Sequence, residues 1–119
     1  MITGYDHVQV AIPRGGEGVA RQFYGDLLGM REQQKPPALA VRGGCWFVSG
    51  SAMLHLGVEE PFAPALKAHP AFVVDDLAAL RSLLTAAGHV CTDALGEIEG
   101  VQRCHTHDPF GNRLEFQQA

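Results

Sequence analysis

The sequence predicts an α+β fold built from two copies of a βαβββ module. Three observations predict it: each half of the chain opens with a strand-like run, continues with an amphipathic helical stretch, and closes with several short strand-like runs. The first module spans about residues 5–60 and the second about residues 66–118. A length of 119 residues is typical of one domain, so we expect a single domain over residues 1–119.

The first module begins with a strand over residues 5–12, where β-branched residues are frequent. A helix is expected over residues 19–28, because apolar residues recur at i, i+3 and i+7 from Ala20. Gly29 ends this helix, as glycine does at many helix C-termini. Glycines and prolines then separate the remaining strands. These are expected at residues 30–34, 38–42, 45–48 and 52–58.

The second module repeats this order after a proline-containing linker, residues 59–68. Its first strand covers residues 70–74. Leucines at i, i+3 and i+7 from Leu77 give the following helix one apolar face, and either Asp75 or Asp76 is its N-cap. The later strands are expected at residues 89–92, 97–98, 101–106 and 113–117. Because one helix covers only one face of a module's sheet, two modules together would shelter a concave surface between the remaining faces.

Four residues of metal-ligand type occupy related positions in the two modules. His7 and His55 are 48 residues apart, and His69 and Glu115 are 46 apart. Alternation along the strands puts each of them opposite the more apolar side of its strand, so all four are expected to face the concave surface. Imidazole and carboxylate groups suit Zn, Fe, Ni, Co or Mn, and three or four protein ligands leave positions for substrate. Without His55, the other three form a two-histidine, one-carboxylate triad.

Further polar residues precede the final strand. His105 and His107 share strand parity with Arg103. They either face the concave surface and contact an anionic substrate, or lie on a solvated strand.

Several segments together resemble the vicinal oxygen chelate superfamily, which includes glyoxalase I, bleomycin-resistance proteins and extradiol dioxygenases. They are FYGDLLGM at residues 23–30, HPAFVVDDLAAL at residues 69–80 and DPFGNRLEF at residues 108–116, within the doubled βαβββ order. The resemblance covers nearly the whole chain and implies a curved mixed sheet around a concave metal site. Its ligands come from the first, fourth, fifth and eighth strands. By position these are His7, His55, His69 and Glu115.

This resemblance implies a small metal-dependent enzyme that acts on an oxygen-rich metabolite. The metal would chelate adjacent substrate oxygens and stabilise an enolate-like intermediate, in lyase, isomerase or dioxygenase chemistry. Bacterial glyoxalase I-like proteins usually carry glutamate where this chain has His55, so His55 is expected as a fourth ligand or as the catalytic base, with His69 as the alternative base if three ligands suffice. The alternative is a bleomycin-resistance-type protein that sequesters a small molecule without catalysis. The resemblance also implies a homodimer.

Charge and hydropathy exclude other classes of partner. The net charge is −4 and no Lys/Arg run stands out, which argues against nucleic-acid binding. No apolar run approaches the roughly 20 residues of a membrane span, and the N-terminal residues have no basic flank. The three cysteines, Cys45, Cys91 and Cys104, are widely spaced and contain no CxxC pair. This pattern favours reduced thiols and a cytoplasmic location.

Overall fold

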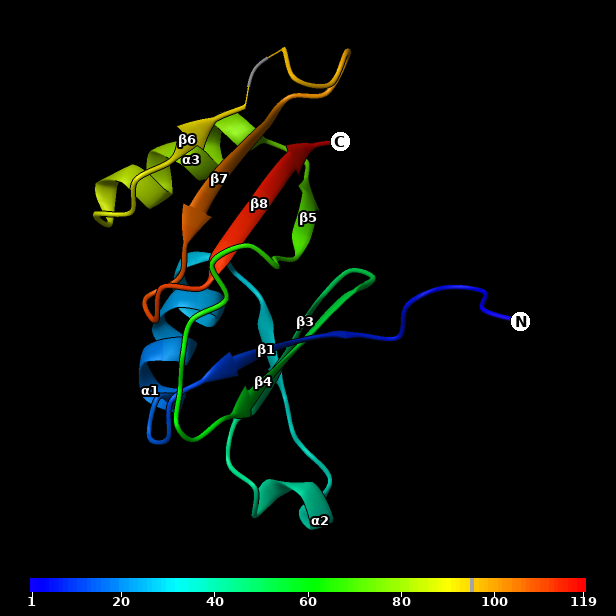
Figure 1. The fold of residues 1–119 in the computed structure, drawn as a ribbon, viewed down its shortest axis with the longest axis vertical. Helices are drawn as coiled ribbons and strands as arrows, with labels where there is room; N and C mark the ends of the chain where they lie inside the picture. Colours follow the sequence, from blue (N-terminus) through cyan, green and yellow to red (C-terminus); the bar gives the residue numbers. More distant parts are fainter. Residues whose placement is uncertain (95) are drawn as a thin grey trace. The chain divides into compact units, whose positions relative to one another are not determined.

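The computed structural model describes residues 1–94 and 96–119, which divide into two units (Figure 1). Unit 1 is Met1–Pro64 and unit 2 is Ala65–Ala119. Each unit contains a four-stranded mixed sheet, in which the unit's first and last strands pair in parallel and the other neighbours are antiparallel. The predicted α+β fold with a repeated strand and helix order is therefore confirmed.

Unit 1 arranges its strands in the order β1-β4-β3-β2. Its elements are β1 (Val8–Ile12), α1 (Glu17–Ala20), the π-helix η1 (Arg21–Leu27), β2 (Arg31–Gln33), α2 (Pro37–Ala40), β3 (Cys45–Ser49) and β4 (Ala52–Val58). The core is formed by apolar side chains of these helices and strands that are almost fully buried. They include Ile12, Ala20, Phe23, Tyr24, Phe47, Leu54 and Leu56.

Unit 2 arranges its strands in the order β5-β8-β7-β6. Its elements are β5 (Ala71–Val74), α3 (Leu77–Ala86), β6 (Thr92–Asp93), β7 (Arg103–His107) and β8 (Arg113–Gln118). Asp76 is the N-cap of α3, because its side chain accepts a hydrogen bond from the backbone N–H of Ala79 at 2.9 Å. The helix runs alongside the sheet of its unit (Figure 1) and buries Leu77 and Leu84. Leu114 and Phe116 of β8 are buried too, and alternation places them on the sheet face opposite Glu115.

Two predicted strands are wrong, and the strand predicted at residues 89–92 is displaced to β6 (Thr92–Asp93). Residues 38–42 were expected to be extended, but residues 37–40 form helix α2. Proline is well suited to the first turn of a helix, and the Ala-Leu-Ala that follows consists of strong helix formers. Residues 97–98 were also expected to be extended, but they lie in a turn between Gly96 and Gly100, whose φ angles are 76° and 74°. Positive φ is the conformation that glycine favours, and it turns the chain there.

The first predicted helix forms, but not as one regular α-helix. Its second part is π-helical, with the N–H of Leu28 donating to the carbonyl of Phe23. Gly29 ends it with φ of 74°, as expected from the sequence. None of the helices in the described part of the chain has the length and hydrophobicity needed to cross a membrane.

A buried turn between β7 and β8 ties the start of unit 2 to the strand that carries Glu115. Both Phe110 and Asn112 donate their backbone N–H groups to Oδ1 of Asp108 at 2.9 Å. The side-chain amide of Asn112 donates to Oδ2 of Asp108 at 3.0 Å and accepts from the N–H of Ala65 at 2.9 Å. The turn predicted at residues 108–112 thus organises the start of β8.

Candidate metal centre

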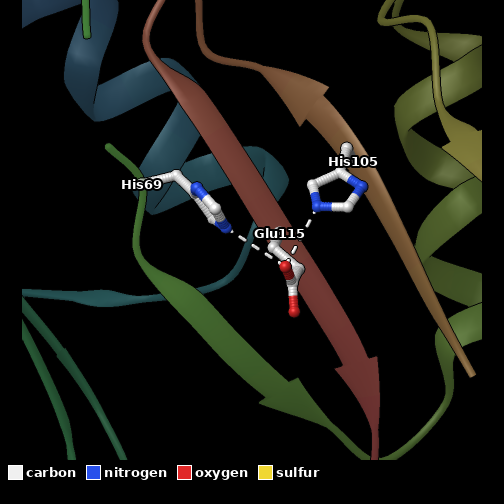
Figure 2. A group of neighbouring side chains, drawn as sticks. All are labelled: His69, His105 and Glu115. Atoms are coloured by element: carbon white, nitrogen blue, oxygen red, sulfur yellow. Dashed lines mark hydrogen bonds and ion pairs between the residues drawn. The ribbon is translucent and has the colours of Figure 1, made fainter. Parts of the chain in front are cut away.

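The candidate metal centre of unit 2 is built around Glu115, in the middle of β8. His105 on β7 is the direct register partner of Glu115, so the two side chains share one face of the sheet. His69 lies just before β5, and the N–H of Glu115 donates to the carbonyl of neighbouring Pro70 at 3.1 Å. Figure 2 shows the side chains of His69, His105 and Glu115 converging from these three segments.

Four side chains donate hydrogen bonds to the Glu115 carboxylate. Oε1 accepts from Nε2 of His69 at 3.1 Å, Nη1 of Arg103 at 2.9 Å and Nε2 of His105 at 3.0 Å. Oε2 accepts from Nε2 of Gln117 at 2.5 Å. The ligand atoms of His69, His105 and Glu115 all lie within 4.8 Å of one another. Neighbouring ligands that are each about 2.1 Å from one ion are about 3 Å apart at a right angle, which matches the distances of 3.1 Å and 3.0 Å from the two histidine nitrogens to the Glu115 oxygen.

The surroundings of Glu115 keep its carboxyl group ionised. Burial alone would raise the pKa of Glu115. The hydrogen bonds from Gln117 and His69, the charge of Arg103 and the hydrogen bond from His105 outweigh burial and lower this pKa from 4.5 to about 2. The residue is therefore an anion throughout the neutral pH range, which is the state that binds a cation.

A second hydrogen bond orients the imidazole of His69. Its Nδ1 lies 2.9 Å from the backbone carbonyl oxygen of Lys67. Because a carbonyl oxygen can only accept a hydrogen bond, Nδ1 carries a proton when this bond forms. Nε2 is then the nitrogen directed at Glu115. Metal-binding histidines commonly use one nitrogen for the ion and donate from the other to a carbonyl or carboxylate.

In unit 1, His55 lies in a stack of three aromatic rings. Its ring centroid is 3.8 Å from that of His7 and 3.9 Å from that of Trp46, with interplanar angles of 16° and 3°. Trp46 is the β3 register partner of His55 on β4, which fixes the ring on that side. The Nδ1 atom of His7 is bonded to Oδ2 of Asp6 at 2.8 Å, which leaves its Nε2 free of this contact.

The stack leaves His55 buried and electrically neutral near pH 7. The residue is 6% exposed, and its Nε2 atom has no hydrogen-bond partner among residues 1–94 and 96–119. Burial, followed by the charge of a protonated His7, lowers the pKa of the His55 imidazole. A buried polar atom without a partner costs free energy.

Stability of the metal-free protein should fall as the pH drops below about 6.5, because His55 then gains a proton more readily in the unfolded chain than in the folded one. One such group contributes at most about 1.4 kcal/mol per pH unit. His55→Phe keeps an aromatic ring in the stack and removes the titration, so its urea-unfolding free energy should fall less between pH 7 and pH 5. His89→Phe is the matched control. Equal slopes for His55→Phe and the wild type would contradict the prediction.

The structure brings the predicted ligands together in pairs, His69 with Glu115 in unit 2 and His7 with His55 in unit 1. It adds three neighbours of Glu115 that the predicted ligand set omits, His105, Arg103 and Gln117. Of the two sequence-based interpretations of His105, the solvated strand is wrong, because its side chain is only 15% exposed and is bonded to Glu115. Strand register was the missing signal, since parity alone does not show which residue lies opposite Glu115.

Comparisons with known proteins agree with this architecture. Residues 4–116 match the Glyoxalase/Bleomycin resistance protein/Dioxygenase superfamily, and the chain belongs to this family. A crystal structure described as that of a glyoxalase family protein from Bacillus anthracis is 47% identical, with a TM-score of 0.94 over 99% of this chain and 96% of that one. A glyoxalase/dioxygenase from Nostoc punctiforme is 20% identical, with a TM-score of 0.74 over 95% and 88% of the two chains, and shows the shared fold. No curated protein matches the sequence.

Proposed function

We propose that this protein is a metal-dependent enzyme that acts on a small, oxygen-rich metabolite. The observation that carries the proposal is the cluster of two imidazole nitrogens and one carboxylate oxygen on one face of the unit 2 sheet. These are donors that Zn, Ni, Co, Mn and Fe accept, and family membership makes a metal site the expected use of such a cluster.

The donor atoms of the cluster fit a divalent ion. His69 and Glu115 are supported both by the sequence pattern and by their contact, and His105 supplies a third donor within the same unit. The proposal that His7 and His55 are also ligands rests on the sequence pattern. The free Nε2 of His55 is compatible with it.

A divalent ion, when bound, supplies Lewis-acid stabilisation of negative charge that develops on substrate oxygens. The protein's own residues would do the rest. Glu115 provides a fixed negative charge, and the hydrogen bond from Nδ1 of His69 to Lys67 holds that ring in orientation. We propose His55 as the catalytic base, taking up a substrate proton at Nε2, because its imidazole is neutral and that nitrogen has no partner in the described part of the chain. A base of this kind favours the proton transfers of isomerases and lyases.

Metal binding should be visible as stabilisation of the chelator-treated protein. A ligand that binds only the folded state at about 100 times its Kd adds about 2.7 kcal/mol, which raises the melting temperature by roughly 10 °C in a domain of this size. We expect such a shift with at least one of Zn²⁺, Ni²⁺, Co²⁺, Mn²⁺ and Fe²⁺, together with stoichiometric metal in the purified protein. A protein that none of these ions stabilises, but that binds an aromatic compound, would instead be a sequestration protein.

Single alanine variants test the ligand set. His105→Ala should weaken metal binding if the unit 2 cluster is the site, and His7→Ala should weaken it if the sequence-based set is complete. His107→Ala is the matched control, because His107 is an exposed histidine on the same strand as His105. Its affinity should equal that of the wild type.

Assembly and location are part of the proposal. The resemblance within the family supports a homodimer, which light scattering of the purified protein tests directly. Free cysteines at positions 45, 91 and 104 fit a reducing compartment, so we propose the cytoplasm as the location.

A further inference from the structure

Arg103 is a cation placed directly on the carboxylate of the candidate metal centre. Its Nη1 donates to Oε1 of Glu115 at 2.9 Å, and its Nη2 donates to Oε2 of Glu97 at 2.8 Å. The side chain is 15% exposed, and its Nε has no hydrogen-bond partner among the described residues. The guanidinium is therefore held mainly by the two carboxylates.

Arg103 differs chemically from the other groups on the same oxygen. His69 and His105 can each give up a proton and offer a lone pair to a metal ion. A guanidinium remains charged at any pH the protein tolerates and has no lone pair to offer. When a divalent ion approaches Oε1, the two histidines can thus become ligands, whereas Arg103 remains a positive charge beside the ion.

We propose that Arg103 is the internal counter-cation of this site, which neutralises Glu115 in the metal-free protein and competes with a divalent ion for its carboxylate. The inference rests on the proposed metal centre. Two positive charges a few ångströms apart repel strongly where solvent screening is weak, and Glu115 is buried. The consequence is a metal affinity lower than the ligands alone would give.

Glu97 gives Arg103 an alternative partner. Its side chain is 64% exposed, whereas that of Glu115 is 4% exposed, so the guanidinium bridges a solvated carboxylate and a buried one. When an ion occupies Glu115, the contact with Glu97 compensates part of the charge on Arg103. Removing the charge of Glu97 should therefore make Arg103 a stronger competitor.

The test is a Zn²⁺ titration of the chelator-treated full chain. Calorimetry in the presence of a competing chelator measures the affinity. Arg103→Gln should bind Zn²⁺ at least about tenfold more tightly than the wild type, because the competing charge is gone. Arg103→Lys keeps the charge and should retain an affinity close to that of the wild type. Arg81→Gln, which removes a half-exposed arginine from its ion pair with Asp93, is the matched control and should change nothing.

Glu97→Gln should weaken Zn²⁺ binding in the wild-type background and have no effect in the Arg103→Gln background. This double-mutant cycle separates an action through Arg103 from a general loss of negative charge. The inference is overturned if Arg103→Gln leaves the affinity unchanged or lowers it, or if Glu97→Gln acts equally in both backgrounds. A wild-type protein that binds no Zn²⁺ while Arg103→Gln also binds none would instead remove the proposed metal centre itself.

Discussion

Replacing Glu115 with glutamine should weaken binding of divalent ions by at least about 100-fold. Loss of a residue that only supports a metal ligand typically costs 10- to 100-fold in affinity, and Glu115 is proposed as a direct ligand. It is also the one anion to which His69, His105 and Arg103 are all bonded. Titration of the chelator-treated protein with Zn²⁺ and Mn²⁺ measures the effect. Glu99→Gln removes an exposed carboxylate of the same unit and should leave the affinity unchanged.

The same variant has a second signature in the metal-free protein. Because the folded-state pKa of Glu115 lies at about 2 instead of 4.5, its ionised form stabilises the fold, by roughly 3 kcal/mol at neutral pH. This contribution is complete above about pH 4.5 and is lost as the pH falls toward 2. Glu115→Gln should thus be less stable than the wild type at pH 7, with the difference shrinking below pH 4.5. A difference that stays constant with pH, or an unchanged metal affinity, would contradict the role given to Glu115.

The pairing of His69 with Glu115 could be predicted from the sequence because it follows from local patterns. Both residues lie in or beside strands, and parity places them opposite the apolar sides of those strands. The role of His105 and Arg103 could not be predicted in the same way. Their contact with Glu115 depends on the register between β7 and β8, which the turn at residues 108–112 sets.

The errors in secondary structure have a related cause. Short segments such as residues 38–42 and 97–98 contain too few residues to show the periodic spacing of apolar side chains that distinguishes a helix from a strand. Local backbone preferences then decide the outcome, through proline at the start of α2 and through glycines with positive φ around residues 97–98. Neither segment contributes a ligand atom to the cluster in unit 2. These errors therefore do not affect the candidate site. Its side chains project from the longer and more regular strands β7 and β8 and from the residue before Pro70.

The DPFGN turn at residues 108–112, which begins the DPFGNRLEF segment of the family resemblance, has a structural role in this chain. Asp108 is 4% exposed, and its two carboxylate oxygens accept hydrogen bonds from two backbone N–H groups and from the side chain of Asn112. Asn112 in turn accepts a hydrogen bond from the backbone N–H of Ala65 at the start of unit 2. The motif thus holds the strand that presents Glu115, although it supplies no ligand atom itself.

Asp108→Ala should accordingly lower the free energy of unfolding by about 3–5 kcal/mol, because it leaves three donors, two of them buried, without their acceptor. Asp108→Asn retains one acceptor oxygen and should lose less. Asp26→Ala, at an exposed position, should stay within about 0.5 kcal/mol of the wild type. Urea unfolding followed by circular dichroism gives all three values. If the motif acts only through the fold, the folded fraction of Asp108→Ala keeps its affinity for Zn²⁺, whereas Glu115→Gln loses it. An Asp108→Ala protein as stable as Asp26→Ala would show that the turn does not hold β8.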